Sequence, residues 1–90
     1  MLYRKNRNVI MYEQDNEGIA QMSDGTLHIL NTTAYEVYSL CENNTKEYII
    51  DALVKKYQTI DRATIQQDVA DILGAMLQKD IISNNDEELA

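Results

Sequence analysis

Asp24-Gly25-Thr26-Leu27-His28-Ile29-Leu30-Asn31-Thr32-Thr33-Ala34 is the stretch that decides the predicted fold. It begins with Asp-Gly, a pair that favours the type I′ turn of a β-hairpin because both central residues of that turn need positive φ angles. Five residues of strand-like composition follow, Thr26–Leu30. From Asn31 the apolar period changes from two to 3.6, which marks the start of a helix. The stretch therefore predicts a hairpin, a strand and a helix cap in direct succession.

Two apolar runs before this stretch predict the other strands of a small sheet. Val9–Tyr12 is rich in β-branched and aromatic residues, and Ile19–Met22 is a weaker second strand. Asp15–Gly18 lies between them and has the residue types of a tight turn. Because both connections are short, an antiparallel meander is the economical topology.

Three amphipathic helices are predicted after the sheet. The first begins at a Thr33–Glu36 capping box or, alternatively, at Asn31. The second begins at Asn44 or Thr45, and the third at Asp61. Their apolar positions recur at helical spacing: Ala34, Val37, Tyr38 and Cys41; Ile50, Leu53, Val54 and Tyr57; and Ile65, Val69, Ile72, Leu73, Met76 and Leu77. The prediction is an α+β, winged helix-turn-helix-like fold, a three-stranded antiparallel β-meander followed by three helices (βββααα).

Composition and charge limit the class of protein. Ninety residues make one domain with a modest core, predicted to span residues 1–82 and to be followed by an acidic, disordered tail at 83–90. The formal net charge of −7 repels phosphate backbones. The single cysteine excludes an intrachain disulfide, and no apolar run approaches the ~20 residues of a membrane span. We therefore expect a cytoplasmic protein that binds neither nucleic acid nor a membrane.

No arrangement of residues predicts a catalytic site, a metal site or a bound cofactor. Cys41 lies on the apolar face of the first helix, where cysteine is usually an inert core residue. His28 is the only histidine, so a site that needs two histidines cannot form. The glycines form no phosphate-binding loop. We expect a binding protein and not an enzyme.

The strand Thr26–Leu30 is predicted to be an open edge of the sheet. It has no charged residue, proline or glycine, and proteins usually block an edge with charge, proline or a bulge. Arg4, Lys5 and Arg7, in contrast, lie beside the first strand. An extended peptide can add to such an edge as a fourth strand. A second copy can also pair with it or swap, so a monomer and an edge-paired or swapped dimer both stay open. The alternative is a short strand covered by the third helix.

The predicted peptide-binding site combines this strand with one line of residues on the third helix. Alternation places Leu27 and Ile29 on one face of the strand, and Thr26, His28 and Leu30 on the other. The helix contributes positions at spacings of three and four residues: Asp68, Ile72, Ala75, Met76 and Lys79. Methionine suits a surface that must adapt to different side chains, and the acidic positions of the helix can pair with a basic residue of the peptide.

An ordered set of residues resembles the PqqD-like family, also known as precursor peptide recognition elements of ribosomally synthesised and post-translationally modified peptides (RiPPs). The matching residues are Asp24-Gly25-x-x-His28-x-Leu30-Asn31-x-Thr33-Ala34-x-x-Val37-Tyr38-x-Leu40, then Thr45, Ile49-Ile50, Leu53 and Tyr57, and finally Asp68-Val69, Ile72-Leu73, Met76 and Ile81-Ile82. The resemblance covers roughly residues 9–82. Two departures are Asp80, where the family commonly has glycine, and Tyr38, where tryptophan is frequent.

The resemblance implies a function and partners. Domains of this family bind the leader region of a precursor peptide as a strand, between the third strand and the third helix. They present the peptide to a RiPP-modifying enzyme, often a radical SAM enzyme. The implied site coincides with the edge and the helix line described above, so leader-peptide binding is the primary hypothesis.

Two other functions stay open. A winged helix-turn-helix can belong to a transcriptional regulator, but the polar face of the third helix offers Asp68 and Asp71 with the single cation Lys79, which is unsuited to DNA phosphates. The chain can also be a purely structural subunit of an enzyme complex.

Overall fold

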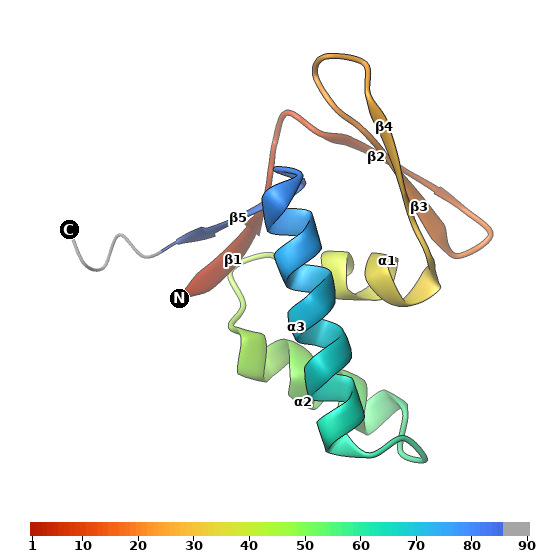
Figure 1. Cartoon of the computed structure of the whole chain (residues 1–90), viewed down its shortest axis with the longest axis vertical. Helices are drawn as coiled ribbons and strands as arrows, with labels where there is room; N and C mark the ends of the chain where they lie inside the picture. The colour runs from red at the N-terminus through yellow and green to blue at the C-terminus, as the bar shows by residue number, and fades with distance from the viewer. Residues whose placement is uncertain (86–90) are drawn as a thin grey trace.

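The computed structural model describes residues 1–85, which form two small sheets and three helices (Figure 1). In chain order the elements are β1 (Leu2–Lys5), β2 (Ile10–Gln14), β3 (Glu17–Gln21), β4 (Leu27–Leu30), α1 (Thr32–Ser39), α2 (Lys46–Lys56), α3 (Arg62–Gln78) and β5 (Ile82–Asn85). The succession of β2, β3 and β4 followed by α1, α2 and α3 confirms the predicted α+β, winged helix-turn-helix-like architecture.

The strands β2, β3 and β4 form an antiparallel meander in that order, so β2 and β4 are its two edges. The residues with the paired positive φ angles of a type I′ turn are Asp15 and Asn16, at 55° and 67°, which join β2 to β3. At the second hairpin only Gly25 has a positive φ angle, 90°. The Asp24 carboxylate there accepts a hydrogen bond from the Thr26 N–H at 2.9 Å. The type I′ turn predicted at Asp24-Gly25 is therefore wrong, although the hairpin is present.

A second sheet, which the sequence analysis did not predict, pairs the two ends of the described chain. β1 runs antiparallel to β5 beside the end of α3 (Figure 1). Asn6 fixes the chain after β1, because its side-chain amide donates to the Asp80 carbonyl at 2.8 Å and its N–H donates to the Ile81 carbonyl at 3.1 Å. Arg4 and Lys5 belong to β1. They therefore do not flank the edge of β2, contrary to the prediction.

The end of α3 is a left-handed turn that directs the chain into β5. Asp80 has a φ angle of 61°. The Ile81 N–H donates to the Met76 carbonyl at 3.0 Å, and the Asp80 N–H donates to the Leu77 carbonyl at 3.1 Å, which together form a Schellman motif. The aspartate in the usual glycine position thus keeps the glycine-like backbone, and the helix still ends there.

The predicted boundary of the domain is too early. Residues 83–85 belong to β5, so the folded domain extends beyond residue 82. The rest of the predicted tail, 86–90, lies outside the described residues.

Each helix begins at a short polar side chain that accepts a hydrogen bond from a backbone N–H three residues later. The caps are Asn31, Thr45 and Asp61, with distances of 2.9, 3.1 and 2.9 Å. This confirms Asp61 as the N-cap of α3. Of the alternatives for the other two helices, Asn31 caps α1 and Thr45 caps α2. The Thr33–Glu36 capping box and the Asn44 cap are not used.

The core lies between the inner face of the meander, the three helices and the second sheet. α1 packs against β3 and β4, α2 packs against α3, and β5 also contacts α3. The fully buried side chains include Val37, Cys41, Ile49, Val69, Leu73, Met76, Ile81 and Ile82. The predicted apolar positions Ala34, Val54, Tyr57, Ile72 and Leu77 are only half-buried and form the border of this core.

Candidate functional site

The outer edge of β4 is the first component of the site. β4 is hydrogen-bonded to β3 on one side, and no strand among residues 1–85 pairs with its other side. The Met22 N–H donates to the Thr26 carbonyl at 2.8 Å, and hydrogen-bonded pairs alternate along an antiparallel ladder. His28 and Leu30 therefore direct their backbone groups toward β3. The N–H and C=O groups of Leu27 and Ile29 point to the open edge.

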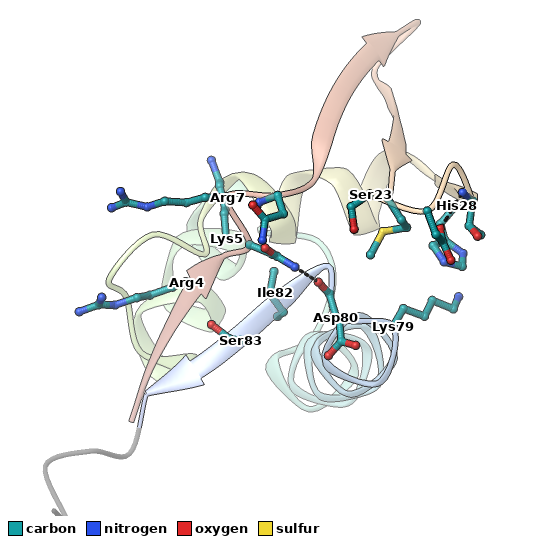
Figure 2. A pocket seen from close by; sticks show the side chains of 14 residues that line it. Arg4, Lys5, Arg7, Ser23, His28, Lys79, Asp80, Ile82 and Ser83 are labelled. Atoms are coloured by element: carbon teal, nitrogen blue, oxygen red, sulfur yellow. Dashed lines mark hydrogen bonds between the residues drawn. The ribbon is translucent and has the colours of Figure 1, made fainter.

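A cleft of about 680 Å³ adjoins the beginning of β4. One wall is the β3–β4 hairpin with Thr26 and His28, and the opposite wall consists of the chain after β1 and the start of β5. Figure 2 shows Ser23 and His28 across the cleft from Ile82, with the Lys79 side chain at the end of α3 extending on the same side as His28. The lining residues are Arg4, Lys5, Asn6, Arg7, Asn8, Met22, Ser23, Asp24, Thr26, His28, Lys79, Asp80, Ile82 and Ser83.

A second, smaller hollow of about 300 Å³ adjoins the other end of β4. It is lined by Asn31, Thr33, Asp68, Asp71 and Ile72. The beginning of β4 is thus close to the C-terminal end of α3, and the end of β4 is close to the middle of α3. At about 1.5 Å per residue, the helix from Asp68 to Lys79 spans about 16 Å, and at about 3.3 Å per residue the strand from Thr26 to Leu30 spans about 13 Å.

Five of the ten predicted site residues line these two hollows. Thr26, His28 and Lys79 come together in the larger cleft, and Asp68 and Ile72 lie in the smaller hollow. His28 and Ile72 are half-buried, and the other three are exposed. These five residues therefore lie beside the two ends of β4, and their role in binding a peptide stays a prediction.

Ala75 lies exposed on α3 between the two hollows. Leu30 and Met76 are placed differently from the expectation, because both are core residues with exposures of 6% and 2%. Leu30 pairs with Gly18 in the ladder and faces the helices, while Met76 continues the buried stripe of Leu73 one turn earlier. Met76 therefore offers no surface to a ligand in this conformation.

Leu27 and Ile29 point away from both hollows. Their side chains are 60% and 73% exposed on the outer face of the meander. The alternation of the two faces of the strand was predicted correctly, but only the Thr26 and His28 face borders the cleft. Leu27 and Ile29 contribute to the open edge through their backbone groups.

The wall formed by the second sheet was missed by sequence reasoning. The start of β5 contributes Ile82 to the larger cleft, and the chain that follows β1 contributes Asn6 and Asn8. The available signal was weak: Leu2–Lys5 and Ile82–Asn85 are four-residue segments from opposite ends of the described chain, and pairing between distant segments leaves no local pattern. Met22 and Ser23, also missed, are lining residues because the hairpin turns beside the cleft.

Charge is distributed unevenly along the site. Four of the eight Lys and Arg residues of the chain line the larger cleft together with Asp24 and Asp80, whereas the charged residues of the smaller hollow are Asp68 and Asp71. Figure 2 shows the Arg4 and Arg7 side chains pointing away from the cleft, and Lys5 lies over the Tyr38 ring, 4.9 Å from its centroid. Lys79 is therefore the cleft cation on the side of β4, where Asp24 also lines the cleft, whereas both charged residues at the other end of β4 are carboxylates.

The thiol of Cys41 has no role in this site. It is fully buried, donates a hydrogen bond to the Val37 carbonyl at 3.2 Å, and burial raises its pKa to about 12. The prediction that Cys41 is a core residue is confirmed. Within residues 1–85 no three His, Cys, Asp or Glu side chains come together as metal ligands, and none of the helices described has the length and apolarity to cross a membrane.

The comparison with family models gives a match over residues 7–82, to coenzyme PQQ synthesis protein D (PqqD). The chain belongs to the PqqD family. This confirms the resemblance found in the sequence. A comparison with curated proteins gives no match.

The PqqD-family chain is also similar to a solved structure, that of TbiB1 in complex with the TbiA(beta) leader peptide. The TM-score is 0.80 with 26% sequence identity, over 91% of this chain and 96% of TbiB1. Most of this chain thus has a structural counterpart in a protein that was solved with a leader peptide.

Proposed function

We propose that this chain binds the leader region of a ribosomally synthesised precursor peptide by β-strand addition to β4 and presents it to a modifying enzyme. The observation that carries the proposal is the unpaired edge of β4, which lies between two hollows that also include residues of α3. The family membership and the similarity to a leader-peptide complex support it. In this proposal the chain is a cytoplasmic binding protein, and the chemistry belongs to a separate enzyme, for which a radical SAM enzyme is the expected class.

The geometry defines how a peptide would bind. The edge groups of Leu27 and Ile29 supply the main-chain hydrogen bonds, which depend little on peptide sequence. Alternate peptide side chains enter the site beside Thr26, His28 and Ile72, which supplies the selectivity. Ordering a disordered leader costs roughly 2–5 kcal/mol, so an affinity near micromolar, about −8 kcal/mol, is expected.

The experiment that tests strand addition is Ile29→Pro with a fluorescently labelled leader of the precursor encoded beside this chain's gene. Proline removes an N–H that points to the open edge, and the ladder to β3 keeps its hydrogen bonds. We expect the dissociation constant measured by fluorescence polarisation to rise at least about tenfold, the factor that corresponds to 1.4 kcal/mol.

The matched control is Glu13→Pro on β2. Ladder alternation starting from the Gln14–Glu17 pair directs the Glu13 N–H to the opposite open edge of the meander, so leader affinity should stay unchanged. Ile29→Val controls for the side chain. Unchanged affinity in a folded Ile29→Pro protein, as judged by circular dichroism, would exclude strand addition at β4.

The DNA-binding alternative finds no support in the site. The exposed polar face of α3 has Gln67 donating to Asp71 at 2.9 Å, beside the exposed Asp68. Carboxylates in these positions repel phosphates. The proposal therefore stays with a peptide.

A further inference from the structure

The outer face of the meander is an exposed apolar surface that the binding of a peptide to the β4 edge does not explain. Five side chains form this surface, which we call the outer sheet face: Ile10 and Tyr12 from β2, Ile19 from β3, and Leu27 and Ile29 from β4. Ladder register places Tyr12, Ile19 and Ile29 in one row across the three strands. A single exposed apolar residue is ordinary, but a contiguous group marks an interaction surface.

The outer sheet face is not covered by the rest of the described chain. The helices lie on the opposite side of the meander (Figure 1), where α1 packs against β3 and β4. Four of the seven exposed large hydrophobic residues within residues 1–85 are on this face: Ile10 at 55%, Tyr12 at 50%, Leu27 at 60% and Ile29 at 73%. Ile19, between them, is half-buried.

The charge around this face indicates what kind of protein can cover it. From residue 9 to residue 30 the chain has neither Lys nor Arg. Asp15 and Glu17 line a hollow on this face together with Ile19 and Ile29, whereas Glu13 alternates with Tyr12 and points to the opposite face. Two copies in face-to-face contact would bring these acidic borders together, which opposes self-association. A partner with an apolar patch bordered by Lys and Arg is complementary in both respects.

We propose that the outer sheet face is the docking surface for the modifying enzyme, through an apolar patch of that enzyme bordered by Lys and Arg. The face reaches the β4 edge through Leu27 and Ile29, so a peptide added as a fourth strand places alternate side chains on the same surface. The enzyme would thus contact sheet and bound leader together, and it would recognise the precursor in its bound form. This inference rests on the proposed function.

The test is the double variant Ile10→Ser/Tyr12→Ser, with the precursor and the purified modifying enzyme encoded beside this chain's gene. Both residues are exposed and lie on β2, which is separated from the β4 edge by β3. We expect the dissociation constant for the labelled leader to stay within about twofold of wild type and the rate of precursor modification to fall at least about tenfold, the effect expected from losing central apolar contacts of an interface. The control is Tyr48→Ser, which removes a tyrosine of similar exposure, 53%, from α2 and should leave both quantities unchanged.

The charge complementarity between the outer sheet face and the enzyme can be measured separately. Asp15→Asn/Glu17→Gln should weaken binding of the purified enzyme to the leader-loaded protein, measured by biolayer interferometry, and should reduce the dependence of that binding on salt. Leader affinity should not change, because Asp15 lies in the turn between β2 and β3 and Glu17 lies at the start of β3, away from the β4 edge.

Three outcomes would overturn the inference. An unchanged modification rate in the Ile10→Ser/Tyr12→Ser protein would exclude this face as the docking surface. Loss of leader affinity in the same protein, with an unchanged circular dichroism spectrum, would assign the face to the peptide. A wild-type dimer that becomes monomeric in the variant by sedimentation equilibrium would assign it to a second copy. If wild type itself fails to bind the leader, the proposed function fails instead, and leader titration identifies that case separately.

Discussion

Gly18 of β3 lies against Tyr35 of α1 so closely that a Cβ atom built on the glycine would be 2.6 Å from Cδ1 of the tyrosine ring. The Met11 sulfur would be 3.0 Å from the same atom. Tyr35 in turn stacks on Tyr38, with ring centroids 6.2 Å apart. Through this contact β3, the middle strand of the meander, packs directly against α1. The contact therefore fixes where the β4 edge lies relative to the helices.

Gly18→Ala should destabilise the protein. The added methyl group would be closer to the Tyr35 ring than Cβ atoms come to other atoms in real structures. Overpacking of a core contact costs about 1–3 kcal/mol. The free energy of unfolding from urea titration should fall by this amount. The matched control is Gly74→Ala on α3, where a Cβ atom meets nothing within 4 Å, and where replacing glycine in a helix should add about 1 kcal/mol of stability. A neutral Gly18→Ala would mean that Tyr35 can move without cost.

Asp80→Gly should stabilise the protein. Asp80 adopts the left-handed conformation, with φ at 61°, which costs about 1 kcal/mol for a residue with a side chain. Glycine removes this cost but gains freedom in the unfolded chain, so a net gain of about 0.5 kcal/mol is expected. Thermal denaturation followed by circular dichroism measures the change. Asp80→Ala, which keeps a Cβ atom and loses the tolerance of aspartate for this conformation, should shift the midpoint downward.

The features of this fold that depend on neighbouring residues could be predicted from the sequence, whereas the pairing of distant segments could not. Local chemistry is visible in a sequence: the helix cap at Asp61, the apolar stripe of α3 and the alternation of Leu27 and Ile29 all depend on neighbours within a few residues. Pairing of β1 with β5 joins opposite ends of the described chain, and no local sequence pattern predicts this pairing. Arg4 and Lys5 were misplaced for that reason.

Sequence patterns also indicate which residues of the candidate site lie close together, although the role of these residues in binding stays a prediction. Thr26, His28 and Lys79 follow from strand alternation and helical spacing, and the structure brings them together. Met76 satisfies the same helical spacing as Lys79, but the position of the helix in the fold decides which of its faces is buried, and Met76 is 2% exposed. Helical periodicity gives the relative orientation of side chains and leaves the rotation of the helix against the core undetermined at its borders.

Glu36 should contribute stability that depends on pH. Its carboxylate on α1 accepts hydrogen bonds from Lys56 and, at 2.5 Å, from the Tyr57 hydroxyl. Burial alone would raise the pKa of Glu36, but the hydrogen bonds and the charge of Lys56 outweigh it and leave the pKa below its ordinary value of 4.5. Because the folded-state pKa is the lower one, the stabilisation is present above pH 4.5 and is lost as pH falls through the folded-state value.

Glu36→Gln should therefore lower the free energy of unfolding at pH 7, by about 1 kcal/mol or more as for hydrogen bonds to a charged group. The difference from wild type should shrink below pH 4.5, the ordinary pKa of this carboxyl. Urea titrations at pH 7 and at several acidic values measure it. Asp51→Asn is the control, since Asp51 and Arg62 form an ion pair whose side chains are 55% and 50% exposed, and such pairs contribute little. A difference that grows on acidification would contradict the assigned sign.

The charge gradient from Asp68 to Lys79 should set the direction of the bound leader. Every pair in the meander is antiparallel, and a peptide added antiparallel to β4 would place its C-terminal side beside Thr26 and Lys79. We therefore expect an acidic residue on that side of the docked segment and a basic residue on the side of Asp68. Lys79→Glu should weaken leader binding roughly two- to fivefold, with a smaller effect at high salt, because exposed charge pairs contribute roughly 0.2–1 kcal/mol and are screened.

The decisive measurement is a double-mutant cycle. A leader whose acidic residue on the C-terminal side is replaced by Lys should bind the Lys79→Glu protein better than it binds wild type, and the coupling energy isolates the pair from other effects of the substitution. The matched test at the smaller hollow combines the Asp68→Lys protein with a leader whose basic residue on the N-terminal side is replaced by Glu. Coupling of Lys79 to the N-terminal side instead would show that the leader runs parallel to β4, which would leave strand addition intact and reverse the assigned orientation.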